Sequence, residues 1–174
     1  KDRATGTQDS THHLVTSVSN QLSQEAVALL PSATAMKRTV QRARVAAGNV
    51  PPTPASLQDL ELPARYRQTH DGGNFLLFDS GPEAGPLRCL VFASNAGMQM
   101  LQGAETWHMD GTFKCVPLLF TQLYTVLARK GEEVLPAAFC ILPNKTTAIY
   151  ETAFQALLDN TPDLQPDAVH CDFE

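Results

Sequence analysis

The sequence predicts a mixed α/β domain in its last third, and two observations lead to this fold class. Three apolar, strand-like runs follow one another with only short turns between them, and a helix-like segment then precedes a fourth run. Strands joined by short turns pair antiparallel, whereas a helical crossover places the next strand parallel to one already present. The expected architecture is a mixed sheet whose central strand has one antiparallel and one parallel neighbour.

The N-terminal part predicts helices. Residues 1–11 are polar and predict a disordered lead-in, and residues 12–48 predict a helical, basic arm. Apolar residues recur at helical spacing from Leu14 onward, and Ser23 is expected to cap a second short helix. After a break at Pro31, Ser32 is expected to cap a helix over residues 33–47, with Gly48 at its C-terminal end.

Charge is divided unevenly along the chain, whose formal net charge is −5 over 174 residues. Residues 1–50 hold six basic and three acidic residues, a net +3, and the remainder holds seven basic and fifteen acidic residues, a net −8. A basic arm on an acidic body is compatible with an anionic partner, and equally with an ordinary solvated helix face. The basic residues of the third predicted helix are Lys37, Arg38, Arg42 and Arg44.

Residues 49–56 form a proline-rich linker, and residues 57–105 predict a lead-in that contains a β-hairpin. After a tight turn at residues 70–73, a strand over Phe75–Phe78 and a second strand through Leu90–Phe92 are expected to pair. A short helix over residues 95–102 should point Met98 and Leu101 inward.

Residues 106–174 carry the pattern that defines the sheet. Proline at position 136 predicts an irregularity or an edge position in the third strand. A right-handed crossover should return the last strand to the side of the first. The expected elements are strands over 107–116, 120–129 and 134–142, a helix over 148–159 and a strand over 168–173.

Two aspartates interrupt the first and last of these strands, and the predicted topology places Asp110 and Asp172 on adjacent strands. Converging carboxylates repel each other unless a cation lies between them. Hard oxygen ligands favour Mg²⁺ or Mn²⁺, and such metals promote in-line displacement at phosphorus. His108 is expected to share a strand face with Asp110. The alternative for Asp110 is a capped turn, because Asp-Gly is a common turn dipeptide.

Several motifs together resemble the transposase domain of Mutator-like elements, from about Thr106 to Glu174. A weaker resemblance over residues 23–81 is to the segment between a FLYWCH-type zinc finger and the catalytic domain of such proteins. The motifs are Asp110-Gly111-Thr112-Phe113-Lys114, then residues 119–125, Leu142-Pro143-Asn144-Lys145-Thr146, and Cys171-Asp172-Phe173-Glu174.

The resemblance implies a ribonuclease-H-like fold, truncated after the fourth strand of its core, and a D-D-E metal site that cuts and joins DNA. Asp110 would be the first acid and Asp172 the second, with Mg²⁺ or Mn²⁺ as cofactor. The family's glutamate lies well downstream of the second acid, so Glu174 is not its counterpart. The chain is therefore expected to be an inactive fragment of a nuclear transposase, with possible self-association in the full-length parent.

The alternative function is a non-catalytic DNA-binding or interaction protein derived from a transposase, which keeps the fold and the basic helix. The missing third acid favours this alternative for the chain taken alone. The residues expected to contact DNA phosphates in either case are Lys37, Arg38, Arg42, Arg44 and Lys114, and for Lys114 a solvated side chain is the default.

The remaining residues predict ordinary structural roles. The four cysteines lack any C-x-x-C pair and lie in or beside apolar runs, so they are expected to be structural thiols. Trp107, Phe113, Phe120 and Tyr124 are expected in the core. No apolar run reaches the length of a membrane span, so no membrane association is expected.

Overall fold

The computed structural model describes residues 6–7, 9–47, 51–113, 115–161 and 164–172. It divides into two compact units, Lys1–Thr53 and Pro54–Glu174, which are taken separately below. Among the described residues, no helix is both long and apolar enough to cross a membrane.

The described residues of the first unit include the helices α2 (Thr11–Ser19), α3 (Gln24–Ala28) and α4 (Ala33–Ala46). Each is preceded by a serine whose hydroxyl oxygen accepts a hydrogen bond from the backbone N–H three residues later. The predicted caps at Ser23 and Ser32 are therefore confirmed. Gly48, predicted to end the third helix, lies outside the described residues.

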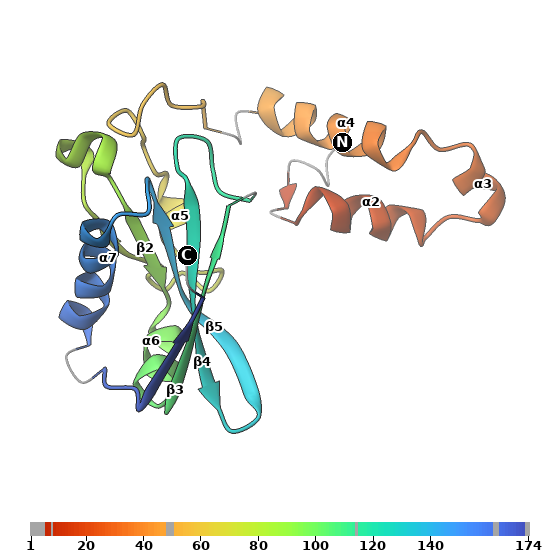
Figure 1. Ribbon diagram of the computed structural model, residues 1–174. Coiled ribbons are helices and arrows are strands. Elements are labelled where there is room, and N and C mark those ends of the chain that lie inside the picture. The colour runs from red at the N-terminus through yellow and green to blue at the C-terminus, as the bar shows by residue number, and fades with distance from the viewer. Residues whose placement is uncertain (1–5, 8, 48–50, 114, 162–163, 173–174) are drawn as a thin grey trace. The chain divides into compact units, whose positions relative to one another are not determined.

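Helices α2 and α4 lie side by side within this unit (Figure 1). Leu14 and Val15 of α2 are buried. The Arg44 guanidinium on α4 donates hydrogen bonds to the backbone oxygens of Thr7 and Asp9, over 3.1 Å and 2.5 Å. These bonds hold the segment that leads into α2 against the last turn of α4.

The second unit is built on a six-stranded sheet in the order β1-β2-β5-β4-β3-β6 (Figure 1). Every neighbouring pair is antiparallel except β3 and β6, which run parallel. The mixed α/β class, the β1–β2 hairpin and the return of the last strand to the side of β3 are thereby confirmed. The strands are β1 (Leu76–Asp79), β2 (Leu90–Ala93), β3 (Thr106–Thr112), β4 (Gln122–Lys130), β5 (Glu133–Leu142) and β6 (Ala168–Cys171).

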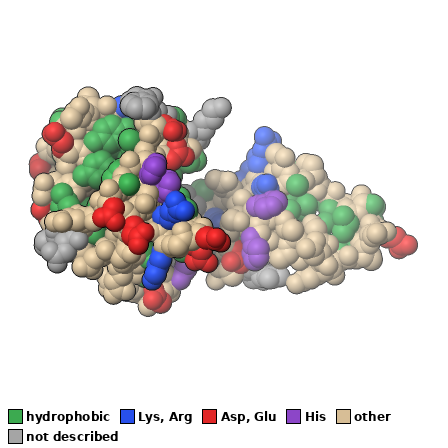
Figure 2. All heavy atoms as spheres, turned by 60° about the horizontal axis from the view of Figure 1, so that its bottom comes forward, with side chains coloured by type: hydrophobic (Ala, Val, Ile, Leu, Met, Phe, Trp, Pro, Cys, Tyr) green, Lys and Arg blue, Asp and Glu red, His purple; other side chains and the backbone are tan. Residues whose placement is uncertain are grey.

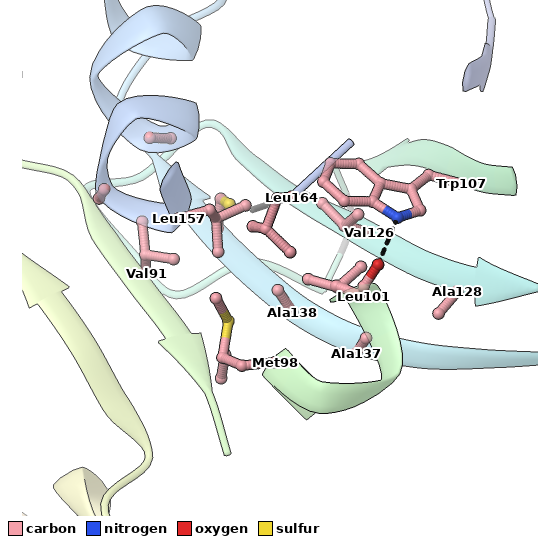
Figure 3. Packing of buried hydrophobic residues seen from close by; sticks show 14 of the residues in the cluster. Val91, Met98, Leu101, Trp107, Val126, Ala128, Ala137, Ala138, Leu157 and Leu164 are labelled. Carbon is pink, nitrogen blue, oxygen red and sulfur yellow. Dashed lines mark hydrogen bonds between the residues drawn. The ribbon is translucent and has the colours of Figure 1, made fainter. Parts of the chain in front are cut away.

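Two helices cover one face of this sheet. Helix α6 (Asn95–Gln102) follows β2, and α7 (Thr147–Asn160) is the crossover between β5 and β6. Their inward side chains join those of the strands in one buried cluster (Figure 3). Within it, the Trp107 indole N–H donates a 3.1 Å hydrogen bond to the backbone oxygen of Leu101. Two short helical segments, α5 (Ala64–Arg67) and η1 (Pro82–Leu87), lie in the lead-in.

The irregularity predicted at Pro136 in β5 is confirmed. Val126 pairs with Ala138, but Leu127 pairs with Pro136, so Ala137 is an extra residue in β5. Strand β2 pairs only with residues 138–141 of β5, so Pro136 also lies beyond that neighbour. The missing N–H of proline therefore leaves no gap in the β2–β5 pairing.

Some sequence-based expectations are wrong in detail. Strand β3 ends at Thr112 rather than Val116, because its last partner is Leu123 on β4. Phe113 is past that end and 36% exposed, with the Lys145 ammonium 3.8 Å from its ring centroid, so it is not a core residue. Trp107 is buried as predicted.

The cysteines divide into two kinds, although all four are free thiols. Cys89 and Cys140 are buried in the sheet, as expected, and burial raises the pKa of the Cys140 thiol to about 12. Cys115 and Cys171 are exposed, so the expectation of four structural thiols is wrong for these two. Cys115 follows the end of β3, and Cys171 is the last residue of β6.

Candidate functional site

The parallel pairing of β3 and β6 brings the two predicted acids to neighbouring positions. The register runs from Thr106 opposite Ala168 to Met109 opposite Cys171, so Asp110 and Asp172 are the next residues on either side. Asp172 directly follows β6, and both aspartates are exposed. The predicted pairing of β3 with β6 is confirmed, whereas Asp172 lies one residue past the end of β6 rather than within the strand.

The two acids nevertheless differ in their immediate surroundings. Side chains alternate along β3, so Met109 and Gly111 face α7 and Asp110 faces the other side with His108. Asp172 borders a cavity of ≈160 Å³ on the α7 side, lined also by Met109, Gly111, Tyr124, Tyr150 and Phe154. Asp172 lies past the end of β6, so the β3–β6 pairing does not fix the side of the sheet that its carboxylate faces.

Aromatic rings form the wall of this cavity. Tyr124 meets Tyr150 edge-on with ring centroids 5.1 Å apart, and Phe154 with centroids 6.2 Å apart. The Tyr150 hydroxyl donates to the side-chain oxygen of Gln122 over 2.8 Å. Gln122 is fully buried, and its side-chain nitrogen has no hydrogen-bond partner among the described residues. The cavity beside Asp172 thus combines apolar walls with a polar group behind them.

Sequence reasoning missed the contribution of α7 to this cavity. Tyr150 and Phe154 are four residues apart and therefore lie on one face of the helix. That spacing was available as a signal, but the strand residue that they meet depends on how α7 crosses the sheet. The next apolar residue of this helix, Leu158, is 38% exposed, because the buried face runs through Ala153, Ala156 and Leu157.

Two histidines stack on the other side of β3 and β6. His108 and His170 are register partners, with ring centroids 4.9 Å apart and an angle of 16° between the ring planes. His108 is half-buried and His170 is exposed. The Nε2 atom of His108 is buried and has no hydrogen-bond partner among the described residues. Each histidine precedes an aspartate by two residues, so a His-x-Asp motif occurs on both strands in register.

The acids supply the right kind of ligand for Mg²⁺ or Mn²⁺ but not a complete set. Carboxylate oxygens are the ligands that these hard cations prefer. Within the described part of the chain, no group of three or more His, Cys, Asp or Glu side chains lies close enough to hold a metal ion. Asp110 and Asp172 therefore fit the chemistry of the metal, with two ligands from the described residues.

The predicted DNA contacts are distributed over both units. On α4, Arg38 and Arg42 are exposed and Lys37 is half-buried. The Arg44 guanidinium donates hydrogen bonds to the backbone oxygens of Thr7 and Asp9. Lys114 lies outside the described residues. In Figure 2, acidic side chains are spread over the visible face of the sheet unit among uncharged ones, and no continuous basic surface crosses that face.

In the comparisons with known proteins, no protein-family model, curated protein or solved structure matches the chain.

Proposed function

We propose that the chain is part of a D-D-E type DNA transposase with a ribonuclease-H-like core. The observation that carries this proposal is the β5-β4-β3-β6 order, with β6 parallel to β3 and an aspartate at the corresponding position of each. The motif resemblance over residues 106–174 supports the same assignment. DNA is then the partner of the parent protein, the nucleus is its location, and self-association belongs to the full-length protein.

The reaction is phosphoryl transfer on a DNA strand. The oxygen of water or of a DNA 3′-hydroxyl forms a bond to phosphorus as the bond to the departing 3′ oxygen breaks. Asp110 and Asp172 would hold Mg²⁺ or Mn²⁺ at the open end of β3 and β6. When bound, the metal activates the attacking oxygen and stabilises the charge on the leaving one. The exposed position of both carboxylates leaves room for a DNA backbone to approach.

The 174-residue polypeptide is expected to bind Mg²⁺ weakly and to leave DNA uncut. Two carboxylates alone do not neutralise the cation as fully as the larger ligand sets of metal-dependent nucleases. The measurement is nicking of supercoiled plasmid with and without Mg²⁺. Nicking that depends on Mg²⁺ and is lost in Asp110→Ala would show that this expectation is wrong.

The function itself is tested on the protein encoded by the complete reading frame. Metal-dependent cleavage at the ends of the cognate element should be lost in Asp110→Asn and in Asp172→Asn. Asp167→Asn is the matched control, because Asp167 is an exposed aspartate immediately before β6. Cleavage that persists in both site variants, or no cleavage by the unmodified protein, would refute the transposase assignment.

A second candidate is a non-catalytic DNA-binding or interaction protein derived from a transposase. The observation that favours it is the two-carboxylate ligand set together with the exposed basic residues of α4. Under this reading Arg38, Arg42 and Lys37 neutralise DNA phosphates, and Arg44 has a structural role in the first unit. Contacts of this kind carry no sequence information.

DNA binding by α4 is expected to be weak, independent of sequence and steeply salt-dependent. Three phosphate contacts give a slope of about −2.7 in a plot of log affinity against log salt concentration. Replacing Lys37, Arg38 and Arg42 with glutamine should flatten that slope and weaken all sequences alike. Lys130→Gln, an exposed change at the end of β4, is the control. DNA binding that is unchanged in the triple variant would show that α4 does not contact DNA.

A further inference from the structure

We propose that the cavity beside Asp172 binds a methylated ammonium group, of the kind carried by trimethyllysine or choline at the end of an aliphatic stem. The cavity has a volume of ≈160 Å³ and is lined by Met109, Gly111, Tyr124, Tyr150, Phe154 and Asp172. The ligand is an organic cation rather than a metal, and the proposal does not rest on the proposed function.

Three aromatic rings from β4 and α7 wall the cavity. The ring plane of Tyr124 makes an angle of 67° with that of Tyr150 and 88° with that of Phe154. Rings set at such angles do not form one flat stack, so they can contact a small ligand from more than one side. The negative face of an aromatic ring attracts a methylated ammonium ion, and several rings together form an aromatic cage for such an ion.

The wall formed by α7 is held in place by contacts within the protein. The Tyr150 hydroxyl donates its 2.8 Å hydrogen bond to the side-chain oxygen of Gln122, and Gln122 is fully buried. Phe154 lies one helical turn after Tyr150 and contacts the same ring of Tyr124. Because these side chains are already ordered, binding costs little of their conformational entropy.

The charge of the lining selects a cation. Among the described residues that line the cavity, Asp172 carries the one charged side chain, so an anion is disfavoured and a cation is favoured there. A strongly hydrated ion such as Mg²⁺ would exchange its water for aromatic walls and a single carboxylate. A methylated ammonium ion instead presents methyl groups to the rings and to the Met109 side chain, and its positive charge to Asp172.

The test is a titration of the full chain with choline, followed by the nuclear magnetic resonance shifts of the backbone amides. Shifts are expected at residues 109–111, 124 and 150–154, which surround the cavity. The neutral analogue of choline, in which a carbon atom replaces the nitrogen, has the same shape and should bind about tenfold more weakly.

A second titration separates two sources of the ammonium group. Its probe is a capped tripeptide with trimethyllysine between two alanines. Tighter binding of the tripeptide than of choline would assign the ligand to a modified protein side chain. Tighter binding of choline would assign it to a small molecule.

Two variants remove the features that select the cation. Phe154→Leu keeps an apolar side chain but removes one ring, so it should weaken choline binding about fivefold or more and leave the affinity for the neutral analogue unchanged. Asp172→Asn should do the same by removing the charge. Asp172 is exposed, so this variant should fold, and circular dichroism checks both proteins.

The matched controls are an aromatic residue and an aspartate outside the cavity. Tyr66 in α5 is 45% exposed, and Asp167 is exposed before β6, so Tyr66→Leu and Asp167→Asn should bind choline as the unmodified chain does. Three results would overturn the proposal. They are the absence of choline-induced shifts around the cavity, equal affinities for choline and its neutral analogue, and unchanged choline binding in folded Phe154→Leu and Asp172→Asn.

Discussion

Replacing Arg88 with methionine is expected to destabilise the sheet unit by about 3 kcal/mol, because it leaves a partly buried carboxylate unpaired. The Arg88 guanidinium is only 6% exposed and binds both oxygens of Asp79, over 2.8 Å and 2.7 Å. It also donates to the backbone oxygens of Leu57 and Leu60, each over 2.9 Å. One side chain thus fastens the segment before α5 to the β1–β2 hairpin.

The effect of Arg88→Met should depend on pH in a defined direction. Burial raises the pKa of Asp79, but hydrogen bonds from Arg88 and the Gly81 N–H, with the Arg88 charge, outweigh it and lower that pKa overall. A lowered folded-state pKa adds stability above the unfolded value of about 3.9, which is lost as the pH falls through the folded value. The free-energy difference between Arg88→Met and the unmodified chain should therefore shrink at pH values below about 4.

Urea unfolding at neutral and acid pH measures both the size and the direction of this effect. Lys130→Met is the control, because Lys130 is exposed at the end of β4, and it should change the unfolding free energy by less than about 0.5 kcal/mol. An Arg88→Met variant as stable as the control at neutral pH would show that the ion pair does not hold the hairpin in place.

Replacing Gly97 with alanine is expected to destabilise the same unit by about 2–3 kcal/mol. A Cβ atom at Gly97 would lie 2.3 Å from the backbone oxygen of Ala137 and 3.2 Å from its carbonyl carbon. That oxygen belongs to the irregular part of β5, so either α6 or the strand must move. Movement of α6 would displace Met98 and Leu101, which are buried against the sheet.

Whether Gly97→Ala lowers or raises the free energy of unfolding distinguishes close packing of α6 on β5 from an open helix position. Alanine in an open helix position stabilises by about 1 kcal/mol relative to glycine, so destabilisation can only come from the contact with β5. Gly103→Ala is the control, since its Cβ would meet an oxygen at an ordinary 3.4 Å and its φ is −91°. Thermal unfolding of the two variants compares them directly. A stabilised Gly97→Ala protein would contradict the close packing of α6 on β5.

The neighbours of β3 could be predicted because they depend on local signals, whereas the pairing of β2 with β5 was not predicted. Connections without a predicted helix indicated that β3, β4 and β5 pair antiparallel, and the helical pattern over α7 indicated that the last connection is a crossover. The predicted caps at Ser23 and Ser32 located the starts of α3 and α4, whereas the cap of α2 at Ser10 was not predicted. The features that were predicted need only the residues next to one another in the chain.

Features that depend on register or on helix placement could not be predicted. The partner of His108 is fixed by the alignment of β6, and a shift of one residue would have moved His170 to the other side of the sheet. The cavity beside Asp172 requires Tyr150 and Phe154 to arrive over β3, which depends on how α7 packs. The Arg88–Asp79 ion pair could have been predicted, because the two opposite charges flank the loop of the predicted hairpin.

The most direct test of the proposed acid pair is Mn²⁺ titration followed by nuclear magnetic resonance of the backbone amides. Paramagnetic broadening falls off steeply with distance, so it locates even a weakly bound ion. We expect it first at residues 109–112 and 171–172, at the open end of β3 and β6. It should disappear in Asp110→Asn and in Asp172→Asn, and persist in His170→Gln and in the Asp167→Asn control. Broadening that survives in both aspartate variants, or that is absent from this end of the strands, would contradict a shared metal site.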